Sequence, residues 1–398
     1  MTTLSSMPAF SEMTLLVVGR SVRCDGSHYY MNPAHRDLLQ GMGEEFGEAI
    51  YLCQRVDVSP TEVNHSGRID DSILRVEAND DWAQSSSTLN RLASLVTDAR
   101  FVRNLSGTIV TYTYYPGFYS FLLSPVIFRI GDFNIGHFGS DAIDTAKVAY
   151  GSGLSGRSKA RLYRWLQSYV VGNIDCIFAT DPRMADEYGA DTIRESKPLI
   201  NFSDTDFHSP EITMSEPIEL LSVGVFRPVK GYSHLIDAVG WLADRSELNF
   251  NLRIVGDGQM RPEIEQKVDS MGLENVVVFP GYIEDEERLA QYYSSADIFV
   301  HSSLKESVPR VFYEATLMGL PIVSTNAGGI PSFFDHRTHA MLTEPADGEA
   351  LGRAIDELAS DPQLAQTLVE NAQQKIEWYV NGSPVSQRMG KIEDRFRS

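Results

Sequence analysis

Two glutamates, Glu306 and Glu314, stand eight positions apart, and this spacing limits the chemistry that they could share. Pro309 lies between them, before an apolar stretch that is typical of a helix start. If the whole stretch were helical, the carboxylates would be roughly 12 Å apart, too far to share a proton or a small metal site. That distance suits an extended ligand held at both ends, such as a sugar and a ribose. The N–H groups of the helix start could face an anion, such as a diphosphate, between them.

A turn at residues 222–231 (S-V-G-V-F-R-P-V-K-G) is the second candidate. Gly224 ends an expected strand and would let the backbone approach a ligand closely. Arg227 and Lys230 follow, just before an expected helix. Cations beside a helix N-terminus would form a diphosphate clamp, because the helix dipole and the side chains act together. The alternative is an exposed turn with ordinary surface charges.

The sequence lacks the motifs of several other kinds of enzyme. The sequence has no G-x-G-x-x-G after its first expected strand and no P-loop lysine motif, which disfavours a dinucleotide-dependent oxidoreductase or an ATPase. Its histidines lack metal-site spacing, and its serines lack a G-x-S-x-G elbow. The three cysteines, Cys24, Cys53 and Cys176, are far apart and odd in number, so we expect thiols rather than a disulfide or zinc site. We expect neither a metal nor a cofactor.

The charge of the chain disfavours nucleic acid as a partner. The formal net charge is −20, and only eight of the 34 basic residues are lysines. An acidic, lysine-poor surface fits a high-salt cytoplasm, where self-repulsion is screened. No apolar run approaches the ~20 residues that span a bilayer, and residues 1–13 do not resemble a signal peptide. We therefore expect a cytoplasmic protein.

Alternating strand and helix patterns surround the candidate residues. In the first half we expect strands at 14–18, 49–52, 108–112, 126–130 and 176–179, and helices at 35–46, 89–102 and 156–171. In the second half we expect strands at 219–223, 250–255, 276–279, 298–300, 321–324 and 340–343. Helices are expected there at 233–245, 260–271, 286–294 and 311–318, and one or two more at 362–396.

This alternation predicts an α/β fold with two Rossmann-like parallel-sheet domains facing each other across a cleft. Ligands bind at the carboxyl ends of the strands in such domains. A length of 398 residues also favours two domains, and 209–217 reads as a proline-flanked linker. We predict an N-terminal domain at 1–208 and a C-terminal domain at 209–380. A final helix at 381–398 is expected to pack back on the N-terminal domain.

The expected helix at 156–171 is both basic and apolar. Arg157, Lys159, Arg161 and Arg164 stand beside Leu162, Trp165, Leu166 and Tyr169. Such a helix could rest on anionic lipid headgroups, which would give a peripheral contact with the cytoplasmic membrane face. A half-solvated helix of the first domain is the alternative.

Taken together, the second half resembles glycosyltransferase family 4, whose members are retaining, nucleotide-sugar-dependent enzymes with the GT-B architecture. The resemblance runs from 219 to about 358. It rests on V-G-V-F-R-P-V-K-G at 223–231, I-V-G-D-G-Q at 254–259, V-F-P-G-Y-I at 278–283, Y-S-S-A-D-I-F-V-H-S-S at 293–303, and the two glutamates.

The resemblance implies roles for the candidate residues. Glu306 would hold hydroxyls of the donor sugar, and Glu314 would hold the ribose. Lys230 would pair with the diphosphate. The family often has arginine where this chain has Val225, and Arg227 could replace that residue. Backbone N–H groups after the first glutamate would face the phosphates, at Val308, Pro309, Arg310 and Val311. A further stretch would border the nucleobase, and its residues are Gly281, Tyr282 and Ile283.

The first half resembles the acceptor-side domain of the family more loosely. Gly26, in the sequence Asp25-Gly26, would lie in a glycine loop after the first strand and face the donor phosphates. Many members place a histidine near the sugar at the end of a middle strand. The corresponding stretch of this sequence lies at 129–133, where Asp132 would stand in place of the histidine.

The activity implied by the resemblance is transfer of a hexosyl group from a nucleoside-diphosphate sugar. The acceptor would be a glycan or a lipid-linked saccharide, in the synthesis of cell-surface polysaccharide or glycoconjugates. Two alternatives stay open: a catalytically silent GT-B binding or scaffold subunit, and a nucleotide-sugar epimerase.

Overall fold

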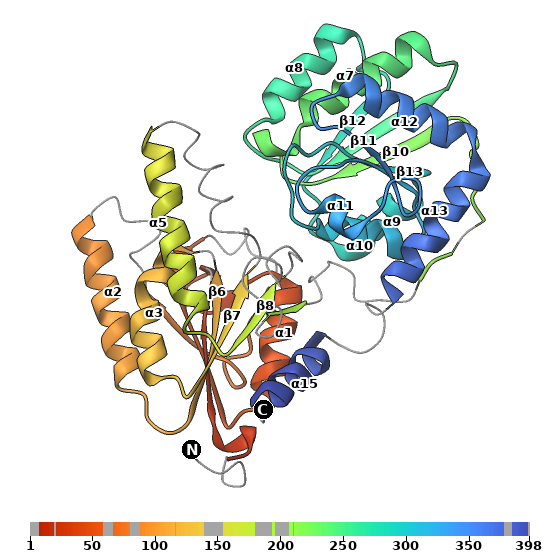
Figure 1. Ribbon diagram of the computed structural model, residues 1–398. Helices are drawn as coiled ribbons and strands as arrows, with labels where there is room; N and C mark the ends of the chain where they lie inside the picture. The colour runs from red at the N-terminus through yellow and green to blue at the C-terminus, as the bar shows by residue number, and fades with distance from the viewer. Residues whose placement is uncertain are drawn as a thin grey trace. The chain divides into compact units, whose positions relative to one another are not determined.

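The chain folds into two compact units, each with its own parallel sheet (Figure 1). The computed structural model describes residues 8–19, 21–58, 67–79, 88–115, 117–138, 154–179, 193–195, 207–209, 211–377 and 384–396. Unit 1 comprises Met1–Leu199 and Gly382–Ser398, and unit 2 comprises Ile200–Asn381. The sequence placed the domain boundary after 208; residues 196–206 lie outside the described part of the chain.

The sheet of unit 1 is parallel except for one hairpin. Its strand order is β3-β2-β4-β1-β6-β7-β8-β9, and β5 pairs with β4. The antiparallel pair is β2 with β3. The strands are β1 (Thr14–Val18), β2 (Val22–Cys24), β3 (Tyr29–Tyr30), β4 (Glu48–Asp57), β5 (Arg75–Asn79), β6 (Ile109–Tyr115), β7 (Phe133–Phe138), β8 (Cys176–Ala179) and β9 (Ile193–Glu195).

Helices cover both faces of this sheet (Figure 1). On one side lie α2 (Thr88–Arg103), α3 (Phe118–Ile130) and α5 (Leu154–Val171); on the other lie α1 (Pro33–Gly43) and α15 (Pro384–Phe396). Alternate side chains of β1 pack into the hydrophobic cores on the two faces of the sheet, because successive residues of a strand point to opposite faces. Leu15 packs in the cluster with α1 and α15, and Leu16 packs in the cluster with α2 and α3.

The C-terminal helix α15 is part of unit 1. Met389 and Ile392 are buried among residues of α1 and the sheet. A segment from the end of the sequence therefore completes the core of the first unit.

One expected strand of unit 1 is a helix. Residues 126–130 form the end of α3, although we predicted a strand there. A short apolar run does not distinguish strand from buried helix, and the apolar residues before Pro125 continue the same helix. The middle strand β7 begins only at Phe133, which moves its carboxyl end several residues along the chain.

Unit 2 has a fully parallel sheet with strand order β12-β11-β10-β13-β14-β15. All six strands expected in this half are confirmed, with ends that differ by at most two residues. They are β10 (Ile218–Val223), β11 (Phe250–Val255), β12 (Val277–Gly281), β13 (Ile298–His301), β14 (Ile322–Thr325) and β15 (Met341–Thr343).

Neighbouring residues of β10 face two different helical layers in unit 2. Leu220 packs with α7 (Tyr232–Arg245) and α12 (Gly348–Ser360), whereas Leu221 packs with α9 (Glu286–Ser294) and α10 (Arg310–Leu317). Helix α12, capped by Asp347, is absent from the sequence prediction. The other helices are α8 (Arg261–Met271), α11 (Ile330–Phe333) and α13 (Pro362–Lys375).

The packing of α15 predicts a cost for truncating its core side chain. Ile392→Ala should lower the free energy of unfolding of unit 1 by about 2–5 kcal/mol, because it removes buried methyl groups and leaves a cavity. Asp394→Ala, at an exposed position of the same helix, should change it by about 0.5 kcal/mol or less. Chemical denaturation followed by a probe in unit 1 checks this, and equal midpoints for the two variants would contradict the packing.

Candidate functional site

Glu306 lies in the loop between β13 and α10, at the carboxyl edge of the unit 2 sheet. Helix α10 begins at Arg310, with Pro309 at its N-cap position, so Glu306 is outside the helix. The estimate that treated 306–314 as continuous helix is therefore wrong for its first part. Pro309 was also included among backbone N–H donors, but proline has no N–H. Pro309 instead contributes its backbone φ angle of −69°, which leads the chain into the helix.

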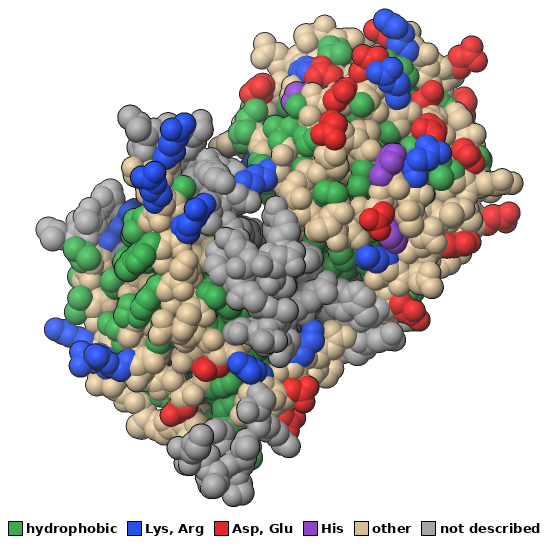
Figure 2. All heavy atoms as spheres, in the orientation of Figure 1, with side chains coloured by type: hydrophobic (Ala, Val, Ile, Leu, Met, Phe, Trp, Pro, Cys, Tyr) green, Lys and Arg blue, Asp and Glu red, His purple; other side chains and the backbone are tan. Residues whose placement is uncertain are grey.

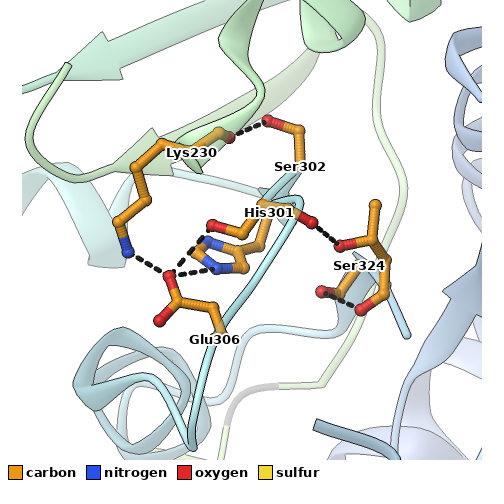
Figure 3. A network of polar contacts seen from close by, with 7 residues as sticks. Lys230, His301, Ser302, Glu306 and Ser324 are labelled. Atoms are coloured by element: carbon orange, nitrogen blue, oxygen red, sulfur yellow. Dashed lines mark hydrogen bonds and ion pairs between the residues drawn. The ribbon is translucent and has the colours of Figure 1, made fainter. Parts of the chain in front are cut away.

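Three side chains converge on one oxygen of the Glu306 carboxylate (Figure 3). Lys230 Nζ makes a short ion pair with Oε1. Ser303 Oγ donates to the same atom at 2.9 Å. His301 Nε2 lies 3.3 Å from it, outside good hydrogen-bond geometry, so this contact is the weakest. Within the described chain no hydrogen bond or ion pair is made to Oε2.

The surroundings keep Glu306 ionised. Burial raises the pKa of its carboxyl, but the contact with His301 and the charge of Lys230 outweigh burial and bring the pKa down to about 2. Burial also lowers the pKa of His301 from its usual value, which favours a neutral imidazole there. At neutral pH the site therefore holds a carboxylate beside an ammonium group.

Backbone contacts fix Lys230 beside the Glu306 loop. Lys230 ends the 3₁₀ turn η5 (Pro228–Lys230), which precedes α7. Ser302 Oγ donates to the Lys230 carbonyl at 3.0 Å, and Leu304 N donates to Val229 O at 2.8 Å. The sheet-edge turn and the Glu306 loop are thus tied together through both backbone and side chains.

Two left-handed glycines allow this close approach. Gly231 has φ 64°, and a Cβ there would lie 2.2 Å from Ser302 O. Gly328 has φ 61°, and a Cβ there would lie 1.9 Å from Glu306 O. Any side chain at either position would push the Glu306 loop away, so these positions require glycine.

The remaining unit 2 candidates lie in different surroundings. Gly224 follows β10 and Gly281 ends β12, both at the carboxyl edge of the sheet. Tyr282 is 69% exposed, whereas Ile283 is buried. Arg227 is exposed and does not contact Glu306, so of the two expected cations only Lys230 joins the carboxylate. Val308 is buried, and Arg310 and Val311 open the first turn of α10, whose N–H groups have no acceptor within the helix.

Glu314 is more enclosed than its expected role suggests. It lies within α10, only 1% exposed, and its Oε2 accepts a hydrogen bond from Tyr293 OH at 2.7 Å. The structure therefore does not bring the two carboxylates into one open site. Ribose binding by Glu314 stays a prediction.

Gly26 does not lie after the first strand. Strand β1 ends at Val18, and Gly26 lies in the hairpin between β2 and β3, with φ 94°. In the sheet β4 separates this hairpin from β1. Asp25 orders the turn by accepting bonds from Ser27 N and His28 N, both at 2.8 Å. The expected position was wrong because β2, at three residues, is too short to detect from its pattern.

The proposed place of Asp132 is also wrong. This residue precedes β7, where its Oδ2 accepts from Ile109 N at 2.9 Å and its own N donates to Ile109 O at 2.8 Å. It therefore joins the amino ends of β6 and β7. Ligands of parallel sheets bind at the opposite, carboxyl edge, so we withdraw Asp132 as a catalytic candidate.

His137 is the residue that the sequence reasoning missed. It lies near the carboxyl end of β7, is 6% exposed, and stacks on Tyr114 with ring centroids 4.8 Å apart. Its Nδ1 lies 2.8 Å from Tyr112 OH. Placing the middle strand at 133–138 would have found this histidine at the strand end where the resemblance calls for one.

Some features are absent from the described residues. No group of three or more His, Cys, Asp or Glu side chains there is placed to hold a metal ion. All three cysteines are buried free thiols, as expected. Among the described helices, none has the length and apolar character to cross a bilayer.

The model of the family described as "Glycosyl transferases group 1" matches residues 204–375. A lipopolysaccharide core biosynthesis glycosyltransferase, LpsE of Rhizobium meliloti, is 27% identical over 51% of this chain and 59% of its own length. Mannosylfructose-phosphate synthase of Agrobacterium fabrum is 36% identical over 33% of this chain and 31% of its own length. These matches thus span less than two thirds of each relative.

Solved structures match over nearly the whole chain. A crystal structure of Alr3699/HepE from Anabaena, in complex with UDP and glucose, has a TM-score of 0.68 and 18% identity, and covers 96% of this chain and 100% of that chain. Sucrose-phosphate synthase from Thermosynechococcus elongatus has a TM-score of 0.68 and 20% identity, with 96% and 99% coverage.

The ion pair at Glu306 predicts a pH dependence of stability. The folded-state pKa of about 2 lies below the ordinary value of 4.5, so the ionised carboxylate stabilises the fold fully above pH 4.5. This stabilisation should be lost as the pH falls from 4.5 towards 2. The measurement is the difference in free energy of unfolding between the unchanged protein and Glu306→Gln. This difference should decrease as the pH falls from 4.5 towards 2. A difference that does not depend on pH would contradict the ion pair.

The chain thus has the GT-B fold of glycosyltransferases, and its residues 204–375, which include Lys230 and Glu306, match the glycosyl transferases group 1 family.

Proposed function

We propose that this protein is a retaining glycosyltransferase that moves a hexosyl group from a nucleoside-diphosphate sugar to a glycan or lipid-linked saccharide. The observation that carries the proposal is the Glu306 carboxylate, which has one oxygen held by Lys230 and Ser303 and the other oxygen left for a ligand. A sugar hydroxyl is a suitable donor to that second oxygen. Support for the donor class comes from a solved relative that was crystallised with UDP-glucose.

Lys230 would stabilise the leaving diphosphate. Its ammonium group pairs with Glu306, and a bound diphosphate would offer it a second anion. The first turn of α10 would add N–H groups on the same side of the sheet. Fixed positive charge that meets charge developing in the transition state lowers the barrier.

The reaction balances without a metal or a protein base. The bond between the anomeric carbon and the diphosphate oxygen breaks, and a bond from that carbon to the acceptor oxygen forms on the same face. The acceptor hydroxyl gives its proton to an oxygen of the leaving phosphate. Glu306 orients the sugar throughout rather than attacking it.

Cell-surface polysaccharide or glycoconjugate synthesis is the process we propose. The names of relatives support it, since they include lipopolysaccharide core and amylovoran biosynthesis glycosyltransferases. The competing candidate is a catalytically silent GT-B subunit. It is favoured by Val225, which is 48% exposed at the position where the family often has an arginine.

We also infer that α2, α3 and α5 of unit 1 form a surface for anionic lipid. These helices carry one acidic residue, Asp98, which is buried and accepts a hydrogen bond from Tyr119. Every exposed charge on them is positive, although the chain carries a net charge of −20. The residues of this basic surface are Arg91, Arg100, Arg103, Arg129, Arg157, Lys159, Arg161 and Arg164.

Apolar side chains are exposed on the same helices. Trp165 is 64% exposed, and Leu162 and Tyr169 lie three positions before it and four after it, on one stripe of α5. Leu92, Val96 and Phe118 add exposed apolar groups on α2 and α3. Figure 2 shows blue side chains towards both ends of these helices and green ones between them. Basic and apolar groups together fit a headgroup layer over acyl chains.

The donor proposal predicts a loss of activity at Lys230. Lys230→Ala should lower kcat/KM at least tenfold, about 1.4 kcal/mol of transition-state stabilisation, with whichever UDP-, GDP- or ADP-sugar the protein uses. Lys267→Ala is the matched control, because that lysine pairs with Asp237 and Ser233 outside the Glu306 loop.

Release of nucleoside diphosphate with an acceptor measures this activity. Equal rates for both lysine variants and the unchanged protein would contradict the assignment of Lys230. Binding of nucleotide without turnover would favour the silent subunit, and conversion of the donor without an acceptor would favour an epimerase.

The membrane proposal predicts selective binding to anionic vesicles. Changing Arg157, Lys159, Arg161 and Arg164 together to Gln should weaken binding at least tenfold, since each basic residue near such a surface contributes about 1 kcal/mol. A control with the same charge change replaces the exposed residues Arg245, Arg288, Arg337 and Arg353 of unit 2. Flotation with phosphatidylglycerol or phosphatidylcholine vesicles measures binding. Equal flotation of the two variants would contradict the proposal.

A further inference from the structure

A buried histidine beside Glu306 has a ring nitrogen without a hydrogen-bond partner. His301 ends strand β13 and is 3% exposed. Its ring packs against Phe299 and Phe312, with ring centroids 6.5 Å and 5.4 Å apart. In the described structure its Nε2 is buried and makes no hydrogen bond, although Glu306 Oε1 lies only 3.3 Å away. A buried polar atom without a partner is costly, so this one requires an explanation.

The oxygen that faces His301 is already occupied by other donors. A carboxylate oxygen has about two lone pairs that accept hydrogen bonds. Lys230 and Ser303 take both of them at Oε1 of Glu306, so a third donor is in excess there. Lys230 and His301 reach this oxygen from different sides (Figure 3). We assign a hydrogen to His301 Nε2, because a nitrogen lone pair would be repelled by the carboxylate.

The three groups around Glu306 Oε1 differ in how freely they can leave. Ser303 is fixed, because its carbonyl accepts a hydrogen bond from Thr325 Oγ1 in strand β14. The His301 ring is held by aromatic packing on β13 and α10. Lys230 has a flexible stem, and 24% of its side chain is exposed. Lys230 is therefore the partner that a ligand can draw away.

We propose that His301 is a positioning residue that takes the place of Lys230 on Glu306 Oε1 when a diphosphate draws Lys230 away. The departing ammonium group frees a lone pair of this oxygen. His301 Nε2 then needs only a small movement to reach a normal N–H···O distance of about 2.9 Å. Glu306 keeps two donors and its orientation towards the sugar. The inference rests on the proposed function in one respect, because the diphosphate of the donor is what attracts Lys230.

Without His301 this exchange would leave Glu306 poorly paired. Burial by itself raises the pKa of the carboxyl, and Ser303 is a single neutral donor. Separating Lys230 from a buried carboxylate is unfavourable when nothing replaces it. A second N–H donor, from His301, lowers that cost. His301 should therefore favour diphosphate binding without contacting the diphosphate.

A purely structural role is the competing explanation. His301 could simply fill space beside Phe299 and Phe312 in the core of unit 2. Its replacement would then cost the same stability whether Lys230 is present or not. A residue that replaces Lys230 becomes more important when Lys230 is absent. A double-variant cycle therefore distinguishes the two explanations.

Thermal unfolding of such a cycle tests the proposal without any ligand. His301→Met should change the melting temperature little when Lys230 is present, because it removes a nitrogen that has no partner. In the Lys230→Ala background it should lower the melting temperature by at least about 3 °C more, since Glu306 loses its second donor. Equal changes in the two backgrounds would overturn the proposal.

Further variants control this comparison. His301→Gln keeps an N–H near the position of Nε2, so it should restore most of the loss in the Lys230→Ala background. His301→Leu is the second apolar replacement, used if near-UV circular dichroism shows that His301→Met does not fold. His339→Met is the matched control, because His339 also stacks on a phenylalanine of unit 2 but faces Asp335. Its effect on the melting temperature should not depend on Lys230.

Calorimetry with UDP, GDP and ADP gives a second readout. His301→Met should weaken binding of the nucleoside diphosphate by at least about fivefold, and His301→Gln should weaken it less. In the Glu306→Gln background His301→Met should have no effect, because no carboxylate then needs a replacement donor. The same loss in both backgrounds would overturn the proposal.

Failure of the proposed function would give a different result. The protein would then bind none of these nucleotides, while the effect of His301→Met on thermal unfolding would still depend on Lys230. That result would contradict the proposed function and support the pairing of His301 with Glu306.

Discussion

The ion pair between Lys230 and Glu306 is the interaction on which the candidate site depends. The Glu306 side chain is only 15% exposed, and a carboxylate so enclosed stays ionised only if a cation or strong donors face it. Lys230 and Ser303 supply that environment, and two hydrogen bonds hold it in place, from Ser302 Oγ to Lys230 O and from Leu304 N to Val229 O. Two glycines, Gly231 and Gly328, let the backbones come close enough for the pair to form.

The asymmetry of this carboxylate gives the site its proposed chemistry. One oxygen takes all the internal contacts, so the carboxylate is fixed in orientation before any ligand arrives. A ligand that brings a hydroxyl to the second oxygen and an anion to the ammonium group would satisfy both charged groups at once. A nucleoside-diphosphate sugar carries these two groups next to each other. Fixed orientation before binding is what transition-state stabilisation by charge requires.

Much of unit 2 could be predicted from the sequence, because its strands are short apolar runs bounded by Gly, Pro or polar residues. Strand β11 and helix α9 match the prediction at both ends, and Lys230 and Glu306 form an ion pair. The enclosure of Glu314 by Tyr293 could not be predicted, since it depends on how α9 packs against α10.

Unit 1 was harder to predict for physical reasons that differ from residue to residue. The apolar run at 126–130 fits a strand or a buried helix equally well, and its misassignment moved attention from His137 to Asp132. The very short strand β2 misplaced Gly26. The contact between Arg388 and Tyr112 joins residues 276 positions apart, and no local pattern signals it. Such contacts follow from the complete fold, and only the structure reveals them.

The most direct test of the central claim compares two ligands on Glu306→Gln by calorimetry. The account predicts that this variant loses affinity for the nucleoside-diphosphate sugar and keeps or gains affinity for the nucleoside diphosphate alone, because Glu306 holds the sugar and its removal frees Lys230 for the phosphates. An equal loss for both ligands, or no loss for either, would contradict the claim that this carboxylate grips the sugar.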